Sequence, residues 1–364
     1  MNDFYIYTDH MAVGYNGRPL IQDIQIRLRR GEILTLIGPN GAGKSTILKS
    51  ITRQLSVLGG TVYLEKNRMQ DLSDKEVSRK MSVVMTDRIQ PELMTCEDVV
   101  AAGRYPYTGR LGILSEEDHR IVQESMEMVH ACELRDCDFT QISDGQRQRI
   151  LLAKAICQQP EIIVLDEPTS FLDIKHKLEL LTILKKLVKE KKLAVIMSLH
   201  EIDLAQKISD AVICVHGDKI EKYGTPEEIF SDAYIRELYG MTKGSYNADF
   251  GCLELEAPKG RPAVFVIGGG GSGIPVYRRL ARQGIPFAAG VLHENDVDYE
   301  VAKALASEVI TEKAFEPIGE EAFRRAEDVI KDCREVICCL KEFGTGNKRN
   351  QELFERWKAR EEQT

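Results

Sequence analysis

The feature that most constrains this chain is a glycine-rich segment directly after a short apolar run. Residues Ile33–Ile37 have the composition of a buried strand, and residues 44–53 after the glycines have helical spacing. The segment that follows the strand and extends into the helical part reads Gly38-Pro39-Asn40-Gly41-Ala42-Gly43-Lys44-Ser45-Thr46. It matches the pattern G-x-x-x-x-G-K-[ST]. Glycines let the backbone turn, so that consecutive N–H groups point at one anion near the positive end of the helix. The sequence predicts a strand, a phosphate-binding loop and a helix.

Two side chains in this segment indicate which phosphates it binds. Lys44 brings a mobile positive charge to the β- and γ-phosphates of a nucleoside triphosphate, and the Ser45 hydroxyl is a ligand for Mg²⁺. We expect the nucleotide to contact all of the residues from 38 to 46.

A second apolar run ends in two acids, as the other half of such a site requires. Residues Ile162–Leu165 are followed by Asp166 and Glu167. We expect Asp166 to hold the Mg²⁺, directly or through water. Glu167 is the candidate general base that polarises an attacking water.

Short β-rich runs alternate with longer segments of helical spacing along most of the chain. This alternation predicts an α/β fold with a mostly parallel core sheet, because several runs are apolar throughout. Residues 4–28 alternate more strongly and predict an antiparallel edge. The other β-rich runs are residues 61–64, 82–85, 194–198 and 211–215, and the other helical segments are residues 116–132 and 174–190.

A change of composition after residue 240 divides the chain of 364 residues. Residues 241–262 are rich in Gly and Pro, and we interpret them as a linker with one short strand near Cys252–Leu255. Residues 263–364 then contain four strand–helix repeats, which predict a small doubly wound α/β domain.

A glycine run opens this second domain. Gly268, Gly270 and Gly273 fit the G-x-G-x-x-G pattern of dinucleotide sites, with Glu294 after the second strand. The pattern is compatible with a small anionic ligand at Gly268–Gly273, and we expect this domain to bind a nucleotide or a transported ligand and to have a modulating role. The pattern is equally compatible with a structural tight turn.

Composition limits the environment and the partners. No apolar run approaches the roughly 20 residues of a membrane-spanning helix, and Met1–Phe4 does not resemble the start of a secretory signal. The net charge of −8 argues against broad nucleic-acid binding. Nine scattered cysteines without a C-x-x-C pair fit reduced thiols in the cytoplasm.

The segment between the two halves of the site is specific to one family. Residues 141–149 read Q-I-S-D-G-Q-R-Q-R at the start of a helical run. This is similar to the L-S-G-G-Q signature of the ABC-type ATPases, which the chain resembles over residues 1–240, including a helical subdomain at about 88–155. Asp173 matches the D-loop aspartate, His200 the switch histidine, and Tyr15 the aromatic residue that stacks on adenine.

The resemblance implies an ATP sandwich between two copies of the chain. Each ATP would lie between the phosphate loop of one copy and Ser143, Gly145 and Gln146 of the other. It also implies that Lys44, Glu167 and His200 carry the hydrolysis, and that Asp173 links the two sites. ATP and Mg²⁺ are the expected ligands.

Two positions depart from the family pattern. Asp144 replaces a signature glycine, and we expect its carboxylate to point away from the nucleotide. The family's glutamine that contacts the metal is replaced by Thr86, with Gln90 as an alternative four residues later. We therefore expect Thr86 among the metal-site residues, with altered coupling or rate.

The stretch Gly103-Arg104-Tyr105-Pro106-Tyr107 is similar to one in importers of iron–siderophore, haem and vitamin B12 compounds. We expect a homodimer on the inner face of the cell membrane that binds transmembrane permease subunits and, through them, a substrate-binding protein. Residues 88–115 are the expected permease interface. In the other interpretation, this segment only caps the helical subdomain. The alternative function is a soluble regulatory or ligand-sensing ABC ATPase not dedicated to transport.

Overall fold

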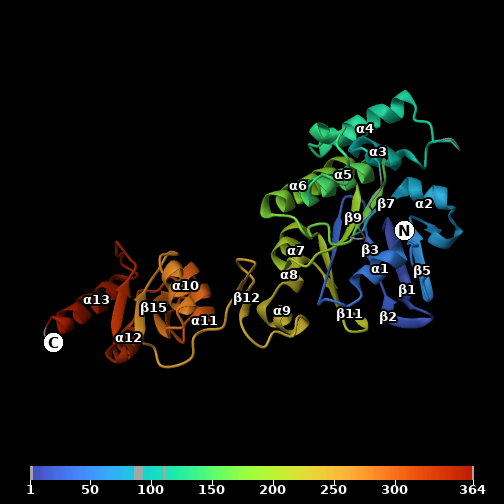
Figure 1. The fold of residues 1–364 in the computed structure, drawn as a ribbon. Coiled ribbons are helices and arrows are strands. Elements are labelled where there is room, and N and C mark those ends of the chain that lie inside the picture. Colours follow the sequence, from blue (N-terminus) through green and yellow to red (C-terminus); the bar gives the residue numbers. More distant parts are fainter. Residues whose placement is uncertain (1–2, 86–92, 110–111, 363–364) are drawn as a thin grey trace. The chain divides into compact units, whose positions relative to one another are not determined.

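The chain divides into two compact units, which are described separately. The computed structural model describes residues 3–85, 93–109 and 112–362 (Figure 1). The first unit is Met1–Phe230 and the second is Ser231–Thr364, so the division falls before the expected residue 240. The reason is that α9 (Asp232–Leu238) packs on β12 (Ser245–Asn247), where the Tyr246 N–H donates to Asp232 Oδ1 at 2.8 Å.

A six-stranded sheet forms the centre of the first unit, in the order β11-β10-β4-β9-β8-β7. All its pairings are parallel except β10 with β11. Every residue of β4, β8 and β9 is buried, as expected for apolar strands covered on both faces. The strands are β4 (Ile33–Ile37), β7 (Met81–Val84), β8 (Ile162–Leu165), β9 (Ala194–Ser198), β10 (Ala211–His216) and β11 (Lys219–Gly224). The predicted α/β fold with a mostly parallel core sheet is confirmed.

An antiparallel sheet accompanies this core, as expected from residues 4–28. In it β1 (Ile6–Tyr15) pairs with β2 (Arg18–Ile24), β3 (Arg27–Leu28) and β5 (Gly59–Leu64), and β5 pairs with β6 (Asn67–Arg68). Side chains of both sheets and of α1 (Lys44–Ile51) form one hydrophobic core. This packing buries one side of the glycine-rich segment's helix against the sheet.

Three helices form the predicted helical region, and α5 contacts the other two (Figure 1). Each begins at a capping box, in which a Ser or Thr side chain and the third helical residue satisfy each other's backbone N–H groups. The helices are α3 (Cys96–Ala101), α4 (Glu116–Met128) and α5 (Asp144–Cys157). The remaining helices of the first unit are α2 (Asp74–Lys80), α6 (Ile174–Lys191), α7 (Ile202–Ile208) and α8 (Pro226–Ile229).

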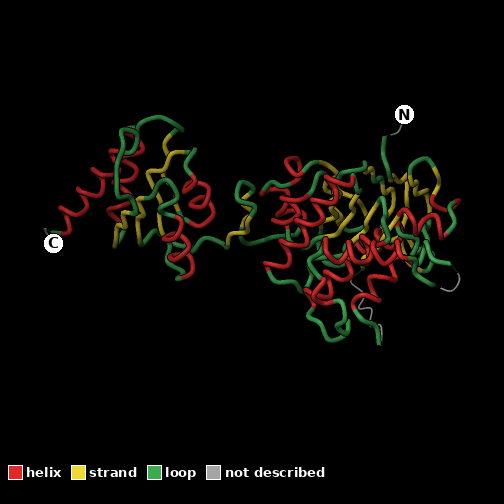
Figure 2. Tube along the Cα trace, turned by 90° about the horizontal axis from the view of Figure 1, so that it is seen from above, coloured by secondary structure: helices red, strands yellow, loops and turns green. Residues whose placement is uncertain are grey.

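The second unit contains a four-stranded parallel sheet in the order β16-β15-β14-β17. Two separate hydrophobic clusters lie on its faces, one with α12 and α13 and the other with α10 and α11. Helices flank the strands of this unit in the backbone trace (Figure 2), and the predicted doubly wound α/β domain is confirmed. Its elements are β14 (Val264–Ile267), α10 (Ile274–Arg282), β15 (Phe287–His293), α11 (Val297–Leu305), β16 (Glu308–Glu312), α12 (Glu320–Asp332), β17 (Glu335–Cys338) and α13 (Lys348–Glu361).

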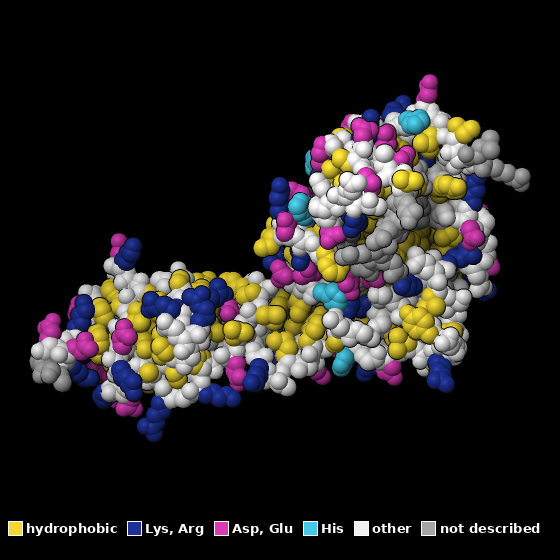
Figure 3. All heavy atoms as spheres, viewed as in Figure 1, with side chains coloured by type: hydrophobic (Ala, Val, Ile, Leu, Met, Phe, Trp, Pro, Cys, Tyr) yellow, Lys and Arg dark blue, Asp and Glu magenta, His cyan; other side chains and the backbone are white. Residues whose placement is uncertain are grey.

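The expected linker is partly structured. It contains the antiparallel hairpin of β12 and β13 (Cys252–Glu254), one strand more than expected. In each unit, charged side chains of both signs are interspersed on the face that Figure 3 shows. Among the described residues, no helix has the length and apolar character needed to span a bilayer.

A buried ion pair joins the Gly103–Tyr107 stretch to the helical region. Arg104 Nε donates to Asp118 Oδ1 at 2.7 Å, and the two residues are 4% and 7% exposed. Arg104 Nη1 also donates to the Cys157 carbonyl at 2.9 Å, and the Tyr107 hydroxyl to the Gln158 carbonyl at 3.0 Å. Arg104 and Tyr107 are therefore structural, whereas Tyr105 is 76% exposed.

This ion pair predicts a pH-dependent contribution to stability. Burial raises the pKa of Asp118, but hydrogen bonds from Ser115 and Arg104 outweigh it and bring the pKa to about 2. A carboxyl whose pKa is lower in the folded state stabilises above its unfolded pKa near ~4, and this is lost as the pH falls toward ~2. We expect Asp118→Asn to cost about 2 kcal/mol at pH 7 in urea unfolding, and less at pH 3. Asp136→Asn, at an exposed position, is the control, and an equal loss at both pH values would contradict the assignment.

Candidate nucleotide-binding site

The glycine-rich segment forms a tight loop between β4 and α1. Gly38 has φ 145° and Gly43 has φ 95°, in the region that side chains rarely adopt. A Cβ atom on Gly38 would lie 2.1 Å from the Val215 carbonyl oxygen of β10. Only glycine therefore lets the loop start this close to the neighbouring strand.

Lys44 is held inside this loop. Lys44 is only 5% exposed, and its Nζ donates to the carbonyls of Gly38 at 2.8 Å and Pro39 at 3.1 Å. Burial lowers the pKa of Lys44, and the nearby carboxylates of Glu167 and Asp166 partly oppose this. An anionic ligand in the loop would favour the charged ammonium further.

The two predicted acids lie at the carboxyl end of β8 and are joined by a residue that sequence reasoning missed. Ser198, the last residue of β9, donates its hydroxyl to Asp166 Oδ1 at 2.7 Å and accepts from the Glu167 N–H at 2.8 Å. Asp166 is 3% exposed. The Ser198 side chain thus orients the acid expected to hold Mg²⁺.

Glu167 is positioned by contacts on both carboxylate oxygens. His200 Nε2 contacts its Oε1, and the Ser170 hydroxyl donates to Oε2 at 3.1 Å. Glu167 has φ 47°, an uncommon left-handed conformation that turns the chain directly after the strand.

One pocket of about 480 Å³ unites the phosphate loop with Glu167 and His200. It is lined by Tyr15, Leu20, Asn40, Gly41, Gly43, Lys44, Ser45, Thr46, Glu167 and His200. Tyr15 is half exposed, and its hydroxyl lies 3.2 Å from Thr46 Oγ1 at the edge of the loop. The structure therefore brings together Tyr15, the phosphate loop, Glu167 and His200, which the sequence pattern had singled out.

The signature residues lie apart from this pocket. Ser143 caps α5, where its Oγ accepts from the Gln146 N–H and its N–H donates to Gln146 Oε1. Asp144 pairs with Arg147 Nη1 at 2.9 Å. Gly145 lies against His176, whose N–H is capped by Asp173 at 2.9 Å. Thr86 and Gln90 lie outside the described residues.

Comparison with known proteins decides the family. Residues 21–170 match the family model described as ABC transporter. An uncharacterized ABC transporter ATP-binding protein of Methanocaldococcus jannaschii, MJ0873, is 43% identical over 286 residues, which are 78% of this chain and 99% of that protein. The chain belongs to the ABC transporter ATP-binding proteins. These proteins are ATP hydrolases, and so is this chain.

Named relatives of this ABC ATPase include importer subunits. The iron(3+)-hydroxamate import ATP-binding protein FhuC of Bacillus subtilis is 34% identical over 64% of this chain and 86% of its own length. The cobalamin import ATP-binding protein BtuD of Halobacterium salinarum is 31% identical over 79% of this chain and 73% of its own.

A solved structure has the same fold. It is the dimeric ATP-binding cassette MJ0796 bound to ADP and Pi, with a TM-score of 0.54, 25% identity, and coverage of 61% of this chain and 98% of that one. Residues 287–363 match a second family model, described as the MJ0874 family.

The expected anion site in the second unit is not supported by the structure. The N–H groups of Gly269 and Gly273 donate to Asp298, and that of Gly270 donates to Asp296. The loop's donors already bind carboxylates of the chain itself, which favours the structural tight turn of the two interpretations that the sequence left open.

Ser198 generates a prediction about the metal dependence of the ATPase. Ser198→Ala removes the hydroxyl that orients Asp166, and partners of this kind typically change metal affinity or activity by about 10–100-fold. We expect the Mg²⁺ concentration for half-maximal ATPase activity to rise at least about tenfold. Ser125→Ala, at a buried serine of α4 whose hydroxyl donates to the Ile121 carbonyl of the same helix, is the matched control. An unchanged Mg²⁺ dependence in Ser198→Ala would show that the hydroxyl has no such role.

Proposed function

We propose that the chain is the ATP-hydrolysing subunit of an ABC importer whose cargo is an iron–siderophore, haem or cobalamin-type compound. ATP hydrolysis, the first part of this proposal, rests on one observation, a pocket that joins Lys44 and Ser45 to Glu167 and His200. The role in import, the second part of the proposal, is supported by the names of the relatives, which include hydroxamate and cobalamin import proteins.

In this proposal the loop amides from 38 to 46 and Lys44 bind the phosphates of ATP, and Tyr15 stacks on the adenine. Ser45 and Asp166 would hold Mg²⁺, whose charge offsets that of the phosphates, and Thr86 is the expected further ligand. Glu167 accepts a proton from the attacking water, while His200 holds Glu167 and reaches the γ-phosphate. The chemistry is mainly positioning and charge compensation.

We further propose that two copies close head to tail across ATP. Ser143, Gly145 and Gln146 then face the γ-phosphate bound by the opposite copy, and Asp173 lies at the junction of the two sites. Phe171 and Ile174, which flank Asp173, are 78% and 79% exposed. Large apolar side chains exposed beside the D-loop are consistent with a surface that a second copy covers.

The permease is proposed to dock beside Tyr105. This exposed aromatic side chain lines a hollow of about 570 Å³ together with Asp74, Lys75, Ser78, Pro106, Thr108 and Gly109. An aromatic ring with a polar tip in a partly charged hollow suits an interface with a polypeptide. The chain would then act at the inner face of the cell membrane.

Glu167→Gln tests the hydrolytic mechanism. The substitution keeps the shape of the side chain but removes the base, so we expect ATP binding to persist while turnover falls by about 100-fold or more. A stable dimer should then accumulate in the presence of ATP. The dimer is measured by size-exclusion chromatography with light scattering, and turnover is measured as phosphate release. Glu133→Gln, at an exposed position of the helical region, is the control. Full turnover in Glu167→Gln would remove Glu167 from the mechanism.

Co-purification tests transport against the alternative, a soluble regulatory or ligand-sensing ABC ATPase. We expect the tagged full chain to co-purify with permease subunits from detergent-solubilised membranes, and Tyr105→Glu to reduce their yield at least about fivefold, because a charge in an interface core is costly. Tyr223→Glu, at a half-exposed tyrosine of β11, is the matched control. Wild-type chain that recovers no membrane protein would favour the soluble alternative.

A further inference from the structure

The glycine-rich loop of the second unit, residues 268–273, binds a carboxylate of its own chain. Asp298 Oδ2 accepts from the N–H groups of Gly269 at 2.5 Å and Gly273 at 2.9 Å, and its Oδ1 accepts from Ile274 at 3.2 Å. The neighbouring Asp296 accepts from Gly270 N–H at 2.9 Å. Two backbone amides of the loop and the first of α10 thus converge on one side chain.

The location of Asp298 is the one that a phosphate takes in dinucleotide sites. Its carboxylate lies at the N-terminus of α10, a helix of nine residues, where the helix dipole and free N–H groups favour an anion. Asp298 is completely buried, at 0% exposed. Burial raises the pKa of its carboxyl, and the hydrogen bonds from Gly273 and Gly269 oppose this rise.

The glycines are explained by packing inside the unit. A Cβ atom on Gly268 would lie 2.5 Å from the Tyr277 hydroxyl oxygen, and one on Gly273 would lie 2.4 Å from the same ring. Tyr277 is fully buried and stacks on Phe287 with ring centroids 5.4 Å apart. Gly268 and Gly273 therefore leave room for a tyrosine beneath the loop, and the motif needs no ligand to account for them.

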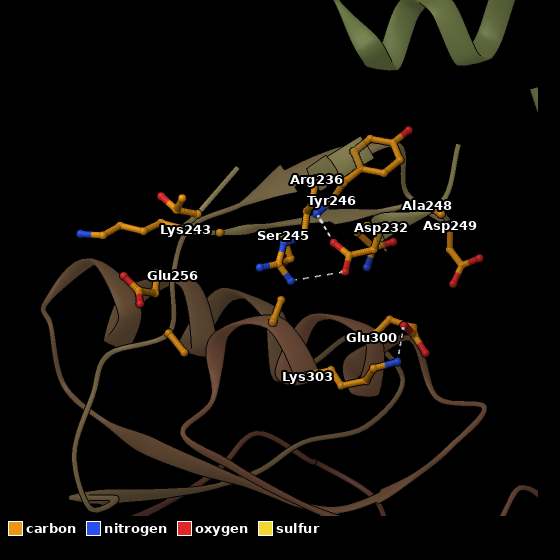
Figure 4. Close-up of a pocket in the computed structure, with 15 residues that line it drawn as sticks. Asp232, Arg236, Lys243, Ser245, Tyr246, Ala248, Asp249, Glu256, Glu300 and Lys303 are labelled. Carbon is orange, nitrogen blue, oxygen red and sulfur yellow. Dashed lines mark hydrogen bonds and ion pairs between the residues drawn. The ribbon is translucent and has the colours of Figure 1, made fainter. Parts of the chain in front are cut away.

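Another hollow of the second unit also lacks the character of an anion site. A pocket of about 450 Å³ lies between the hairpin with α9 on one side and α11 on the other (Figure 4). Two of its three cations pair with acids of the same lining, since Arg236 lies 4.0 Å from Asp232 and Lys303 lies 3.7 Å from Glu300. Charges of both signs give this pocket no preference for a phosphate.

We infer that Asp298 is an internal anion that closes the glycine-rich loop in place of a phosphate. The second unit is then not a dinucleotide-binding domain, although it has the strand, glycine loop and helix of one. Asp298 ties the start of α11 to the start of α10 and makes the loop a structural clamp. The inference does not depend on the proposed transport function.

An experiment on the wild-type chain tests whether the N–H groups of residues 268–273 are available to an added ligand. Hydrogen–deuterium exchange of the full chain, with peptides that cover residues 264–282, is measured with and without millimolar NAD⁺ or inorganic phosphate. We expect no change in these peptides, whereas peptides at residues 38–46 serve as an internal reference for binding at the first unit. Ligand-dependent protection at residues 268–274 would overturn the inference.

Asp298→Ala tests whether the carboxylate stands in for phosphate. We expect the melting temperature of the second unit in the full chain to fall by about 10 °C, because three N–H groups lose their acceptor. Inorganic phosphate at 100 mM should then restore about 5 °C, by binding the vacated amides. Asp328→Ala, an exposed aspartate of α12 that pairs with Lys331, is the control and should show neither effect.

The other possible outcomes of the Asp298→Ala experiment also test this inference. A folded Asp298→Ala variant as stable as the control, or one that phosphate stabilises no more than the control, would overturn it. If Asp298→Ala does not fold, the exchange measurement on the wild-type chain decides alone. Asp296→Ala, which frees only the Gly270 N–H of the loop, should gain phosphate-dependent protection at Gly270.

Discussion

The register of the buried parallel strands in the first unit is the constraint on which its site depends. Leu36 of β4 pairs with Ser198 of β9, and Leu165 of β8 pairs with Met197, so the three strands end at one edge of the sheet. A slip of one residue would turn Asp166 or Ser198 to the other face of its strand. Because each strand is buried on both faces, such a slip would also displace apolar side chains from the core. Packing far from the nucleotide therefore positions the acids.

The two glycine-rich loops of the chain show why such a motif is not sufficient to assign a ligand. Both follow the first strand of a parallel sheet and open a helix. The first places a lysine, Lys44, at the helix start, whereas the second continues as Ile274-Pro275 without a cation. The second instead receives the carboxylate of Asp298 from the next helix along the chain. The sign of the charge brought to the helix N-terminus distinguishes a site open to phosphate from one already filled.

Local sequence patterns predicted most elements to within a few residues, because apolar runs and helical spacing are local properties. Six strands and both acids of the first unit were found in this way. Contacts between distant segments were not accessible: residues 61–64 were predicted as a β-rich run without a partner, and the pairing of β5 with β1 gave no local signal. Ser198 gave no signal of its own, since a serine at a strand end is common. Arg104 was taken for part of an interface, yet its partner Asp118 lies 14 residues away in another helix.

The second matched family model begins inside a single sheet. The match to the Methanocaldococcus protein spans 286 residues, more than the first unit of Met1–Phe230, so the likeness to an ABC ATPase continues into the second unit. The MJ0874 family model begins at residue 287, the first residue of β15, and leaves out β14. Yet β14 lies between β15 and β17 and is hydrogen-bonded to both. Residues 287–363 alone would therefore lack the central strand of their sheet and expose the edges of β15 and β17. Strand β14 and residues 287–363 therefore belong to one folding unit.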